Sequence, residues 1–469
     1  MSASTDRRPG RTAPGEGGGL DALAGRRVVV LGFARTGRAA ARLLAAAGAA
    51  VVAVEDAPAA DAAETAAGSG ARLVVAPGRN ELAELLAGAD LVVVSPGVPP
   101  SHPLFALADP TRLVSEVELA GRVAAVPIAA VTGTNGKTTV TSLAAAMLEA
   151  SGRACVAAGN IGLPLIEAVA DPALDVVVAE VSSFQLATTD RFHPFVAAHL
   201  NLAADHLDWH GSTAAYAAAK ARVFANQEAA DVAIANADDP ASLRAARTSP
   251  GRLVTFGHAG ADYTELAGDL VTPDGSLLPV ARLARRLPHD RVNALAAAAV
   301  ARAAGATLEG CRAALEAWRP LAHRVAHVAT VGGVAYYDDS KATTPSAVAA
   351  AVAGFDAVVL VAGGRNKGLD LGELAAAARP GGRAVVHAVV AIGEAADEVV
   401  EAFAGTGCAL RRACSMDEAV VAARDLARPG DAVLLSPGCA SFDWYRSYAE
   451  RGDDFARAVR ALERSGGDR

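Results

Sequence analysis

The sequence predicts an α/β protein with mostly parallel sheets, arranged in three domains. Short runs of valine, isoleucine and leucine that end in glycine alternate with alanine-rich stretches suited to helices. Continuous apolar runs of this kind are typical of parallel strands buried on both faces. The chain has 469 residues, a length that suggests about three domains. Its 52% hydrophobic and 20% charged residues describe an ordinary globular protein.

The clearest apolar runs place strands at 26–32, 90–97, 127–133, 175–180, 356–364 and 431–438. We expect three α/β domains, at 21–125, 126–319 and 320–469. Residues 1–20, rich in glycine, proline, arginine and serine, are predicted to be a disordered tail. Early in the third domain, residues 323–341 predict a hairpin that turns at Gly332-Gly333.

Composition excludes several classes of protein. A net charge of −8 without long charged runs argues against a nucleic-acid partner. The five cysteines are scattered and form no CxxC pair, which favours a reduced cytoplasmic protein without a zinc or disulfide framework. No uncharged stretch of 18 residues predicts insertion into a membrane.

Lysine is rare in this chain and occurs at informative places. Of 43 basic residues only four are lysine, so 39 (43 minus 4) are arginine. An ammonium is a compact point charge that can lose its proton, whereas guanidinium is planar and effectively always charged. Lys137, Lys341 and Lys367 lie in glycine-rich or acid-flanked turns. We therefore expect the lysines to mark the active site rather than to be random survivors of codon bias.

The segment GTNGKTT (133–139) predicts a phosphate-binding loop. It follows the apolar run PIAAV and precedes an alanine-rich helix. Backbone N–H groups and the helix N-terminus can face phosphates, Lys137 can neutralise their charge, and Thr138 can hold Mg²⁺. The full GxxxxGK spacing is not met because position 131 is valine. The strand–loop–helix context nevertheless predicts nucleotide binding.

Two further positions are candidate metal ligands. Glu180 ends a predicted strand, where its carboxylate can reach a metal held by Thr138. Its alternative role is to cap the helix of the next segment. His206 and His210 have the i,i+4 spacing of a zinc pair, but the flanking aspartates and glycine favour a loop over a helix. Only His206 is therefore predicted to be a ligand.

Lys220 lies in a predicted helix, 213–227, rather than in a turn. Helical periodicity places it on one stripe with Tyr216, Val223 and Phe224. Such a lysine usually extends its ammonium to solvent. The alternative is a buried amine whose charged form is disfavoured. A neutral amine can react with CO₂ to form a carbamate, which would bind a metal as a carboxylate does.

The first predicted domain carries a loop, Gly32 to Gly37, directly after a strand, and Glu55-Asp56 closes the next strand. This pattern imitates a dinucleotide fingerprint, but Ala34 replaces the middle glycine. Alone the pattern is weak. It fits a mononucleotide or a diphosphate group as well as NAD.

Taken together, the motifs of this chain resemble those of the Mur ligase family, in the family's order from about residue 26 to the C-terminus. The motifs are GTNGKTT, GNIG (159–162), EVSSFQL (180–186), DHLDWH (205–210), YAAAK (216–220), HR (323–324), DDSKAT (338–343), GGRNKG (363–368) and SPGCASFDWY (436–445). The SPG turns, DSKAT and the closing ASFDWYRSYAERGDDF are most similar to the members that add D-glutamate. The resemblance implies a Rossmann-like UDP-substrate domain at 21–125, a central P-loop ATPase domain at 126–319 and a C-terminal Rossmann-like domain at 320–469 that binds the incoming amino acid.

The activity implied by this resemblance is ATP-dependent amide formation. ATP would phosphorylate the L-alanyl carboxylate of UDP-N-acetylmuramoyl-L-alanine, and the amine of D-glutamate would then displace phosphate. Attack of one anion on another needs charge neutralisation, which explains a site of lysines and Mg²⁺. The implied cofactors are ATP, two Mg²⁺ ions and a carbamate on Lys220.

The resemblance also implies roles for individual residues. ATP would be bound by Gly133, Thr134, Asn135, Gly136, Lys137, Thr138, Thr139, Asn293, Arg324 and Asp339. One Mg²⁺ would be held by Thr138 and Glu180, and the other by His206 and carbamylated Lys220. The UDP-muramoyl substrate would contact Gly32, Arg35, Thr36, Gly37, Asp56, Ser95, Asn160 and His206. D-glutamate would contact Lys341, Thr343, Lys367, Ser441, Phe442 and Tyr448. The catalytic groups would be Lys137, His206, Lys220 and Lys341. One departure is Asp290, where the family pattern leads us to expect an asparagine-like nucleotide contact.

Three alternatives remain at this point. A sibling ligase or a folylpolyglutamate-type synthetase would share the central domain, although no DNPR-like signature for a diaminopimelate acceptor is present. An NAD-dependent oxidoreductase would rest on the first domain alone and would leave the lysines unexplained. A non-catalytic nucleotide-binding regulator would not need Lys220, Lys341 and Lys367 together. The resemblance favours a cytoplasmic, monomeric enzyme.

Overall fold

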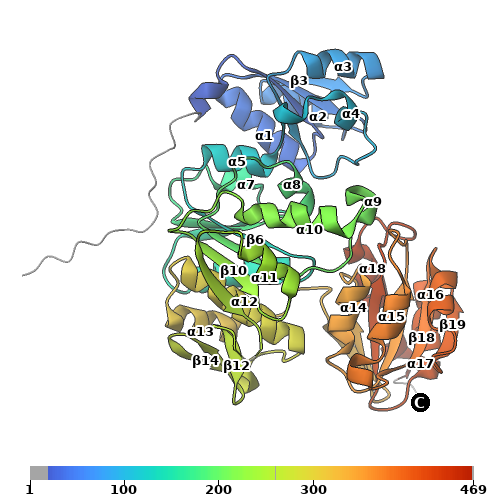
Figure 1. Ribbon diagram of the computed structural model, residues 1–469. Helices are drawn as coiled ribbons and strands as arrows, with labels where there is room; N and C mark the ends of the chain where they lie inside the picture. Colours follow the sequence, from blue (N-terminus) through green and yellow to red (C-terminus); the bar gives the residue numbers. More distant parts are fainter. Residues whose placement is uncertain (1–19, 259, 467–469) are drawn as a thin grey trace, which may run out of the picture. The chain divides into compact units, whose positions relative to one another are not determined.

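The computed structural model describes residues 20–258 and 260–466 (Figure 1). The chain forms two compact units. Among the described residues, one comprises 20–202, 214–258, 260–279 and 293–316, and the other comprises 203–213, 280–292 and 317–466. The predicted tail lies outside the described residues except for Leu20, which already belongs to a 3₁₀ turn, η1 (Leu20–Leu23). The division into three contiguous domains stays a prediction.

The first sheet is parallel throughout, with the strand order β3-β2-β1-β4-β5. Its strands are β1 (Arg27–Leu31), β2 (Ala50–Glu55), β3 (Arg72–Val75), β4 (Leu91–Val94) and β5 (Leu113–Ser115). The helices of this region are α1 (Arg35–Ala46), α2 (Ala62–Gly68), α3 (Arg79–Ala87), α4 (Leu104–Leu107), η2 (Pro110–Arg112) and α5 (Glu116–Val123). The order reverses between β1 and β4, and the crevice at such a switch point is where parallel sheets bind ligands.

A second parallel sheet follows, with the order β11-β10-β9-β6-β8-β7. Its strands are β6 (Ile128–Thr132), β7 (Cys155–Gly159), β8 (Val176–Glu180), β9 (Val196–His199), β10 (Val232–Asn236) and β11 (Arg252–Phe256). Among its helices are α6 (Lys137–Glu149), α7 (Leu165–Ala168), α8 (Ser183–Ala187), α10 (Thr213–Ala221), η3 (Arg222–Phe224) and α11 (Pro240–Ala246). Strands β6 and β8 are completely buried, which explains why they carry no polar residue before their last position.

A small antiparallel meander and two helices continue the chain. The meander consists of β12 (Thr264–Leu266), β13 (Asp269–Thr272) and β14 (Gly275–Pro279). After a short turn, η4 (Val280–Arg282), come α12 (Pro288–Ala303) and α13 (Leu308–Ala317). Eight consecutive residues of α12, Ala294–Ala301, are buried, because alanine lets a helix pack closely on its neighbours.

The third sheet has the order β15-β16-β20-β17-β18-β19, and only β15 is antiparallel to its neighbour. Its strands are β15 (Ala326–Val331), β16 (Val334–Asp338), β17 (Val358–Gly363), β18 (Val386–Ile392), β19 (Ala409–Ala413) and β20 (Ala432–Gly438). Its helices are α14 (Pro345–Val352), α15 (Gly372–Ala377), η5 (Pro380–Gly382), α16 (Ala396–Ala402), α17 (Met416–Leu426) and α18 (Tyr448–Gly466). Two apolar clusters fill this unit, and the strands contribute buried residues to both.

The α/β class and the mostly parallel sheets are confirmed, as are all the strands predicted from the apolar runs. The predicted hairpin is confirmed as β15–β16, with Gly332 and Gly333 at φ 60° and 81°. Two consecutive positive φ values match the turn that best fits the twist of a hairpin. Across residues 20–258 and 260–466, no helix combines the length and the apolar character needed to cross a membrane.

The prediction of a loop around His206 and His210 is wrong in part. Residues Leu207–His210 form a single helical turn, α9. His206 precedes it with φ 52° and Gly211 ends it with φ 73°. These left-handed residues at both ends confine the helix to one turn, which the sequence pattern did not reveal.

Candidate active site

The predicted phosphate loop lies between β6 and α6, at the carboxyl edge of the second sheet. Gly136 has φ 86°, and a Cβ there would lie 2.6 Å from Oδ1 of Asn293. Glycine is therefore required, and the predicted ATP residue Asn293 lies directly against the loop. The backbone N–H of Asn135 donates to Oδ1 of Asn201 (2.8 Å), and Thr134 N donates to the Asn201 carbonyl (2.9 Å). These bonds hold the loop open toward the start of α6.

Two lysines meet at one backbone carbonyl of this loop. Nζ of Lys137 donates to the carbonyl oxygens of Gly133 (2.8 Å) and Thr134 (2.9 Å). Nζ of Lys220 donates to the same Gly133 oxygen at 2.6 Å and lies 4.7 Å from the centroid of the Tyr216 ring. The geometry thus brings both predicted catalytic lysines of this unit to the phosphate loop.

Lys220 is only 1% exposed, so of the two alternatives the extension of its ammonium to solvent is wrong and the burial of its amine is confirmed. The predicted stripe is confirmed, since Tyr216, Val223 and Phe224 are equally buried. The α-helix ends at Ala221 and continues as a 3₁₀ turn, which keeps these side chains on one face. A lysine enclosed in this way is tied to a fixed position beside the loop.

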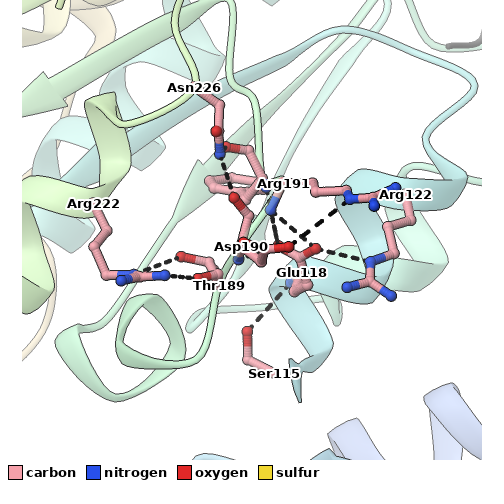
Figure 2. Close-up of polar contacts among 9 residues, drawn as sticks. Ser115, Glu118, Arg122, Thr189, Asp190, Arg191, Arg222 and Asn226 are labelled. Carbon is pink, nitrogen blue, oxygen red and sulfur yellow. Dashed lines mark hydrogen bonds and ion pairs between the residues drawn. The ribbon is translucent and has the colours of Figure 1, made fainter. Parts of the chain in front are cut away.

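Figure 2 shows the polar frame that fixes the end of the Lys220 helix. Glu118 is completely buried, and its carboxylate accepts the three consecutive backbone N–H groups of residues 190–192 at 2.8–3.0 Å. Arg222 donates to the carbonyl of residue 189, and Asn226 donates to the carbonyl of residue 190 at 2.8 Å. The segment 189–192 is therefore held by α5 on one side and by the residues following Lys220 on the other.

Glu180 provides a buried carboxylate at the end of β8. It is 2% exposed, and its Oε1 accepts from Nδ2 of Asn160 (2.8 Å). Its Oε2 is buried and has no hydrogen-bond partner among the described residues. The alternative role as a helix cap is wrong, because Ser182 caps α8 together with Gln185.

The unsatisfied oxygen of Glu180 fits a divalent cation. Within the described ranges, no group of three or more histidine, cysteine, aspartate or glutamate side chains is arranged to hold a metal. Mg²⁺ needs no such cage, since it is usually bound by one or two carboxylates together with water and substrate phosphates. Thr138, in the first turn of α6, and Glu180 are therefore a suitable protein contribution to a Mg²⁺–nucleotide site.

Sequence reasoning missed His199, which ends β9 beside this site. It is 1% exposed, and its Nδ1 has no partner among the described residues. Burial, together with the positive charges of Lys220 and Lys137, lowers the pKa of His199 to about 3, although the charge of Asp239 opposes this shift. The imidazole is therefore neutral. A polar residue closing the apolar run FVAAH was the available signal, as in the run that ends at Glu180.

A cavity of about 570 Å³ opens at the carboxyl ends of β1 and β4. Six of the predicted substrate residues line it, namely Gly32, Arg35, Thr36, Asp56, Ser95 and Asn160. Asn160 also donates to Glu180, so one side chain both lines the cavity and contacts the predicted metal carboxylate. Residues 96–99, His102 and Gln185 line the cavity as well but were not predicted to contact the substrate, although Pro96, Gly97 and Gln185 lie in the quoted SPG and EVSSFQL motifs.

Gly37 does not line the cavity but allows its glycine loop to form. A Cβ on Gly37 would lie 1.9 Å from the carbonyl oxygen of Gly32. Ala34 precedes α1 with an ordinary φ of −81°, so alanine in place of glycine causes no strain there. Glu55 accepts the N–H of Phe33 at 2.6 Å and so binds the loop itself.

In the second compact unit, the predicted acceptor residues follow β16, β17 and β20 at one edge of the third sheet. Nζ of Lys341 lies 3.7 Å from the centroid of the Tyr448 ring. Nζ of Lys367 forms an ion pair with Oδ1 of Asp205 at 2.7 Å. Ser441 is buried, whereas Phe442 is 63% exposed. Thr343, between Lys341 and α14, is half-buried.

The residues predicted to contact ATP from this unit lie near its first hairpin. Asp339 is buried and accepts from Oγ of Ser436 (2.7 Å) and from Val325 N (3.2 Å). Burial raises the pKa of Asp339 to about 7, against the effects of the Ser436 hydrogen bond and of Arg324. Asp290 accepts two 2.7 Å bonds from Arg285, so this departure from the family pattern is a partly buried ion pair.

Several predicted pairings join residues of different compact units, which are each described by themselves. They are His206 with Lys220, His206 with Asn160, and Arg324 and Asp339 with the phosphate loop. These pairings stay predictions.

Two family descriptions match the chain over more than half its length. "Mur ligase middle domain" matches residues 131–301, and "Mur ligase, glutamate ligase domain" matches residues 323–439. The chain belongs to the Mur ligase family. Mur ligases use ATP, in agreement with the loop at Lys137.

Individual relatives of this Mur ligase extend the match to nearly the whole chain. It is 46% identical to a UDP-N-acetylmuramoylalanine–D-glutamate ligase from Frankia casuarinae, covering 94% of this chain and 95% of the relative. It is 44% identical to the ligase of the same name from Desulfosudis oleivorans, covering 93% and 97%. The solved structure of MurF from Acinetobacter baumannii is similar in fold, with a TM-score of 0.58, 20% identity and 93% of both chains covered.

Proposed function

We propose that this Mur ligase joins D-glutamate to UDP-N-acetylmuramoyl-L-alanine at the expense of ATP, in the synthesis of a peptidoglycan precursor. The observation that carries the proposal is the identity of 44–46% with ligases named for that reaction, over more than nine-tenths of each chain. The lysines agree with it, because Lys137 lies at a phosphate loop and Lys341 and Lys367 lie in loops of the other unit.

The proposed reaction has two steps, phosphorylation of a carboxylate and attack by an amine. A carboxylate oxygen of the L-alanyl group attacks the γ-phosphorus of ATP, the bond to ADP breaks, and an acyl phosphate forms. The amine of D-glutamate then attacks the acyl carbon, phosphate leaves with the electron pair of the C–O bond, and the nitrogen loses a proton to solvent. Lys137 and the backbone N–H groups at the start of α6 stabilise the phosphate charge in the first step.

Mg²⁺ held by Thr138 and Glu180 would add charge neutralisation at the phosphates. Asn160 donates a hydrogen bond to Oε1 of Glu180. The other oxygen, Oε2, has no hydrogen-bond partner among the described residues and is therefore available to bind the cation. Gly136 and Asn293 set the position of the loop against α12. The hydrogen bonds from residues 190–192 to Glu118, and from Arg222 to the carbonyl of residue 189, hold the end of the Lys220 helix in a fixed position relative to α5.

Lys220 is proposed to act as a carbamate. Its amine nitrogen attacks the carbon of CO₂, an N–C bond forms, and the displaced proton leaves to water. The product is an anion that, with His206, would hold a second Mg²⁺. Burial of Lys220 beside the phosphate loop supports this role, since burial disfavours the charged form of an amine and so favours the neutral form that reacts with CO₂.

The acceptor site is proposed to lie at Lys341, Thr343, Lys367, Ser441, Phe442 and Tyr448. Two ammonium groups suit an acceptor with two carboxylates, which D-glutamate has and a monocarboxylate lacks. A sibling ligase with another acceptor is the alternative. Cytoplasmic location and a monomeric state are further parts of the proposal, drawn from the family resemblance.

The decisive experiment measures phosphate release by the purified protein with ATP, Mg²⁺ and UDP-N-acetylmuramoyl-L-alanine. We expect release with D-glutamate and far less with L-glutamate, L-lysine or diaminopimelate. Equal or faster turnover with a diamino acid would overturn the acceptor assignment. Phosphate release that needs no amino acid would favour a nucleotide-binding regulator, and hydride transfer to NAD would favour an oxidoreductase.

A further inference from the structure

Arg451 is a buried cation that the reaction as described does not use. It lies in the first turn of α18, and its side chain is 1% exposed. Among the described residues, it is the largest side chain that is fully buried. Arginine is rarely buried to this extent unless it is paired with an acid. Its partners therefore indicate why it is retained.

The guanidinium of Arg451 is bonded only to neutral oxygens among the described residues. Nε donates to Oγ of Ser340 (2.9 Å) and Nη2 donates to the carbonyl of the same residue (2.9 Å). Nη2 also donates to the Cys439 carbonyl (3.1 Å), and Nη1 donates to the Ala440 carbonyl (3.2 Å). No carboxylate bonds to it within the described part of the chain, so hydrogen-bonded acids do not cancel its charge.

Arg451 nevertheless remains charged at neutral pH. Burial lowers its pKa to about 10, and the nearby Asp443 is the largest opposing influence. A protonated guanidinium thus lies behind the loops, in surroundings of low polarity where its field is weakly screened.

The two loops that Arg451 joins carry most of the proposed acceptor residues. Ser340 directly precedes Lys341, and Ala440 directly precedes Ser441. Oγ of Ser340 also donates to the carbonyl of Tyr448 (2.7 Å), which packs its ring on Lys341. One side chain therefore ties together the loops after β16 and β20 and the start of α18.

The loop after β17, which carries Lys367, packs against the same group. A Cβ on Gly364 would lie 3.0 Å from Nη1 of Arg451 and 2.3 Å from the Ala440 carbonyl. Glycine at this position is what lets the third loop approach the guanidinium.

We infer that Arg451 is a positioning residue for the acceptor amino acid. It sets the spacing of Lys341 relative to Ser441 and Phe442, and its charge strengthens the attraction of the site for an anionic acceptor. This inference rests on the proposed function, in which those loops bind a dicarboxylate. Arg451 itself is not proposed to touch the acceptor.

The test compares Arg451→Lys and Arg451→Met with a control on the same helix. Arg457 is a suitable control, because it is half-exposed and paired with Asp417 and Asp454. We expect Arg451→Met to raise the KM for D-glutamate by about tenfold or more, since several charge-assisted bonds are lost. The KM for ATP should stay within about twofold, and Arg451→Lys should give a smaller effect because one point charge cannot satisfy the fork of acceptors.

Arg457→Met should leave the KM for D-glutamate unchanged. If Arg451→Met does not fold, Ser340→Ala removes one acceptor of the same network and should raise the same KM in the same direction. An unchanged KM for the acceptor in these variants, or equal rises for all three substrates, would overturn the inference. Wild-type protein that turns over a different amino acid would refute the acceptor assignment instead, and the variants would then be scored with that amino acid.

Discussion

Lys220 and Arg451 are buried basic residues that differ in what surrounds them. Lys220 lies at the phosphate loop on the carbonyl of Gly133, close to the predicted metal residues. Arg451 lies behind loops that it ties together through four hydrogen bonds. A lysine can be converted to an anion by CO₂, whereas a guanidinium stays cationic. The same charge type therefore suits two roles, a modifiable ligand and a permanent positive centre.

At the level of single residues, we predict that Lys220 works as an anion rather than as a cation. Lys220→Arg should lose activity although it keeps the positive charge, and Lys220→Ala should lose activity by a factor on the order of 10² or more. Formate or acetate should partly restore the alanine variant by supplying oxygens in the vacated space, whereas methylamine should not. Steady-state phosphate release measures both effects.

The controls for Lys220 separate its charge from its fold. Unfolding curves of both variants should match the wild type closely enough to exclude collapse of the site. Full activity of Lys220→Arg, or rescue by methylamine alone, would show that the residue acts through its positive charge.

Helix α5 illustrates how one element connects others through its first turn. Glu116 accepts the N–H of Ile166 at 2.7 Å, and Glu118 accepts the three N–H groups of residues 190–192. Ser115 caps the helix by accepting the Glu118 N–H at 3.2 Å. Acids at a helix N-terminus are favourable for the helix itself, and here both also satisfy distant backbone donors.

At the level of elements, we predict that Glu118 matters more for stability than the cap of its helix. Glu118→Ala leaves three N–H groups without their acceptor, of which that of Phe192 is buried and those of residues 190 and 191 are part-buried. Each costs ~1–3 kcal/mol unless water reaches it. Ser115→Ala should cost about 1 kcal/mol, the usual value for a lost cap. Urea unfolding should therefore rank the two variants in this order, and a reversed order would contradict the frame shown in Figure 2.

A second element-level prediction concerns pH. Burial raises the pKa of Glu116 from 4.5 to about 7, so the folded state binds its proton more tightly than the unfolded state. Stability should then fall as pH rises from about 4.5 to 7 and level off above, with a total of about 3 kcal/mol at most. In Glu116→Gln this decline should be smaller. The unfolding free energy of the variant minus that of the wild type should therefore be more positive at pH 8 than at pH 5.

The control for this pH effect is Glu81→Gln, because Glu81 is an exposed acid in the first turn of α3. Its pH dependence should equal that of the wild type. Some decline should remain in Glu116→Gln, since Asp339 has a pKa raised in the same direction. A decline of unchanged size in Glu116→Gln would show that its carboxylate is not the group that titrates.

At the level of the whole molecule, the proposed reaction needs groups from both compact units. Lys137 and Lys220 belong to one unit, and Lys341 and Lys367 belong to the other. We predict that ATP and UDP-N-acetylmuramoyl-L-alanine together favour a closed arrangement, as substrate binding does in enzymes that assemble their site by domain closure. Small-angle scattering should show a smaller radius of gyration with both ligands than with nucleotide alone, and an unchanged profile at saturation would contradict closure.

Much of the fold follows from local properties of the sequence. The runs at 127–133 and 175–180 identified β6 and β8, because a strand buried on both faces must be apolar along its whole length. Gly332-Gly333 identified the hairpin, because two consecutive positive φ values are accessible mainly to glycine. The rarity of lysine indicated Lys137, Lys220, Lys341 and Lys367, and the structure places the first two at one carbonyl.

Other features were decided only by the tertiary structure. The neutral state of His199, the lining of the cavity by residues 96–99 and the hydrogen-bond network of Arg451 were not predicted from the sequence, because each depends on which loops the strand order brings to the same sheet edge. The burial of Lys220 is of the same kind. A helical stripe can face either a core or a ligand, and only the packing of α10 against the phosphate loop determined that this lysine is enclosed.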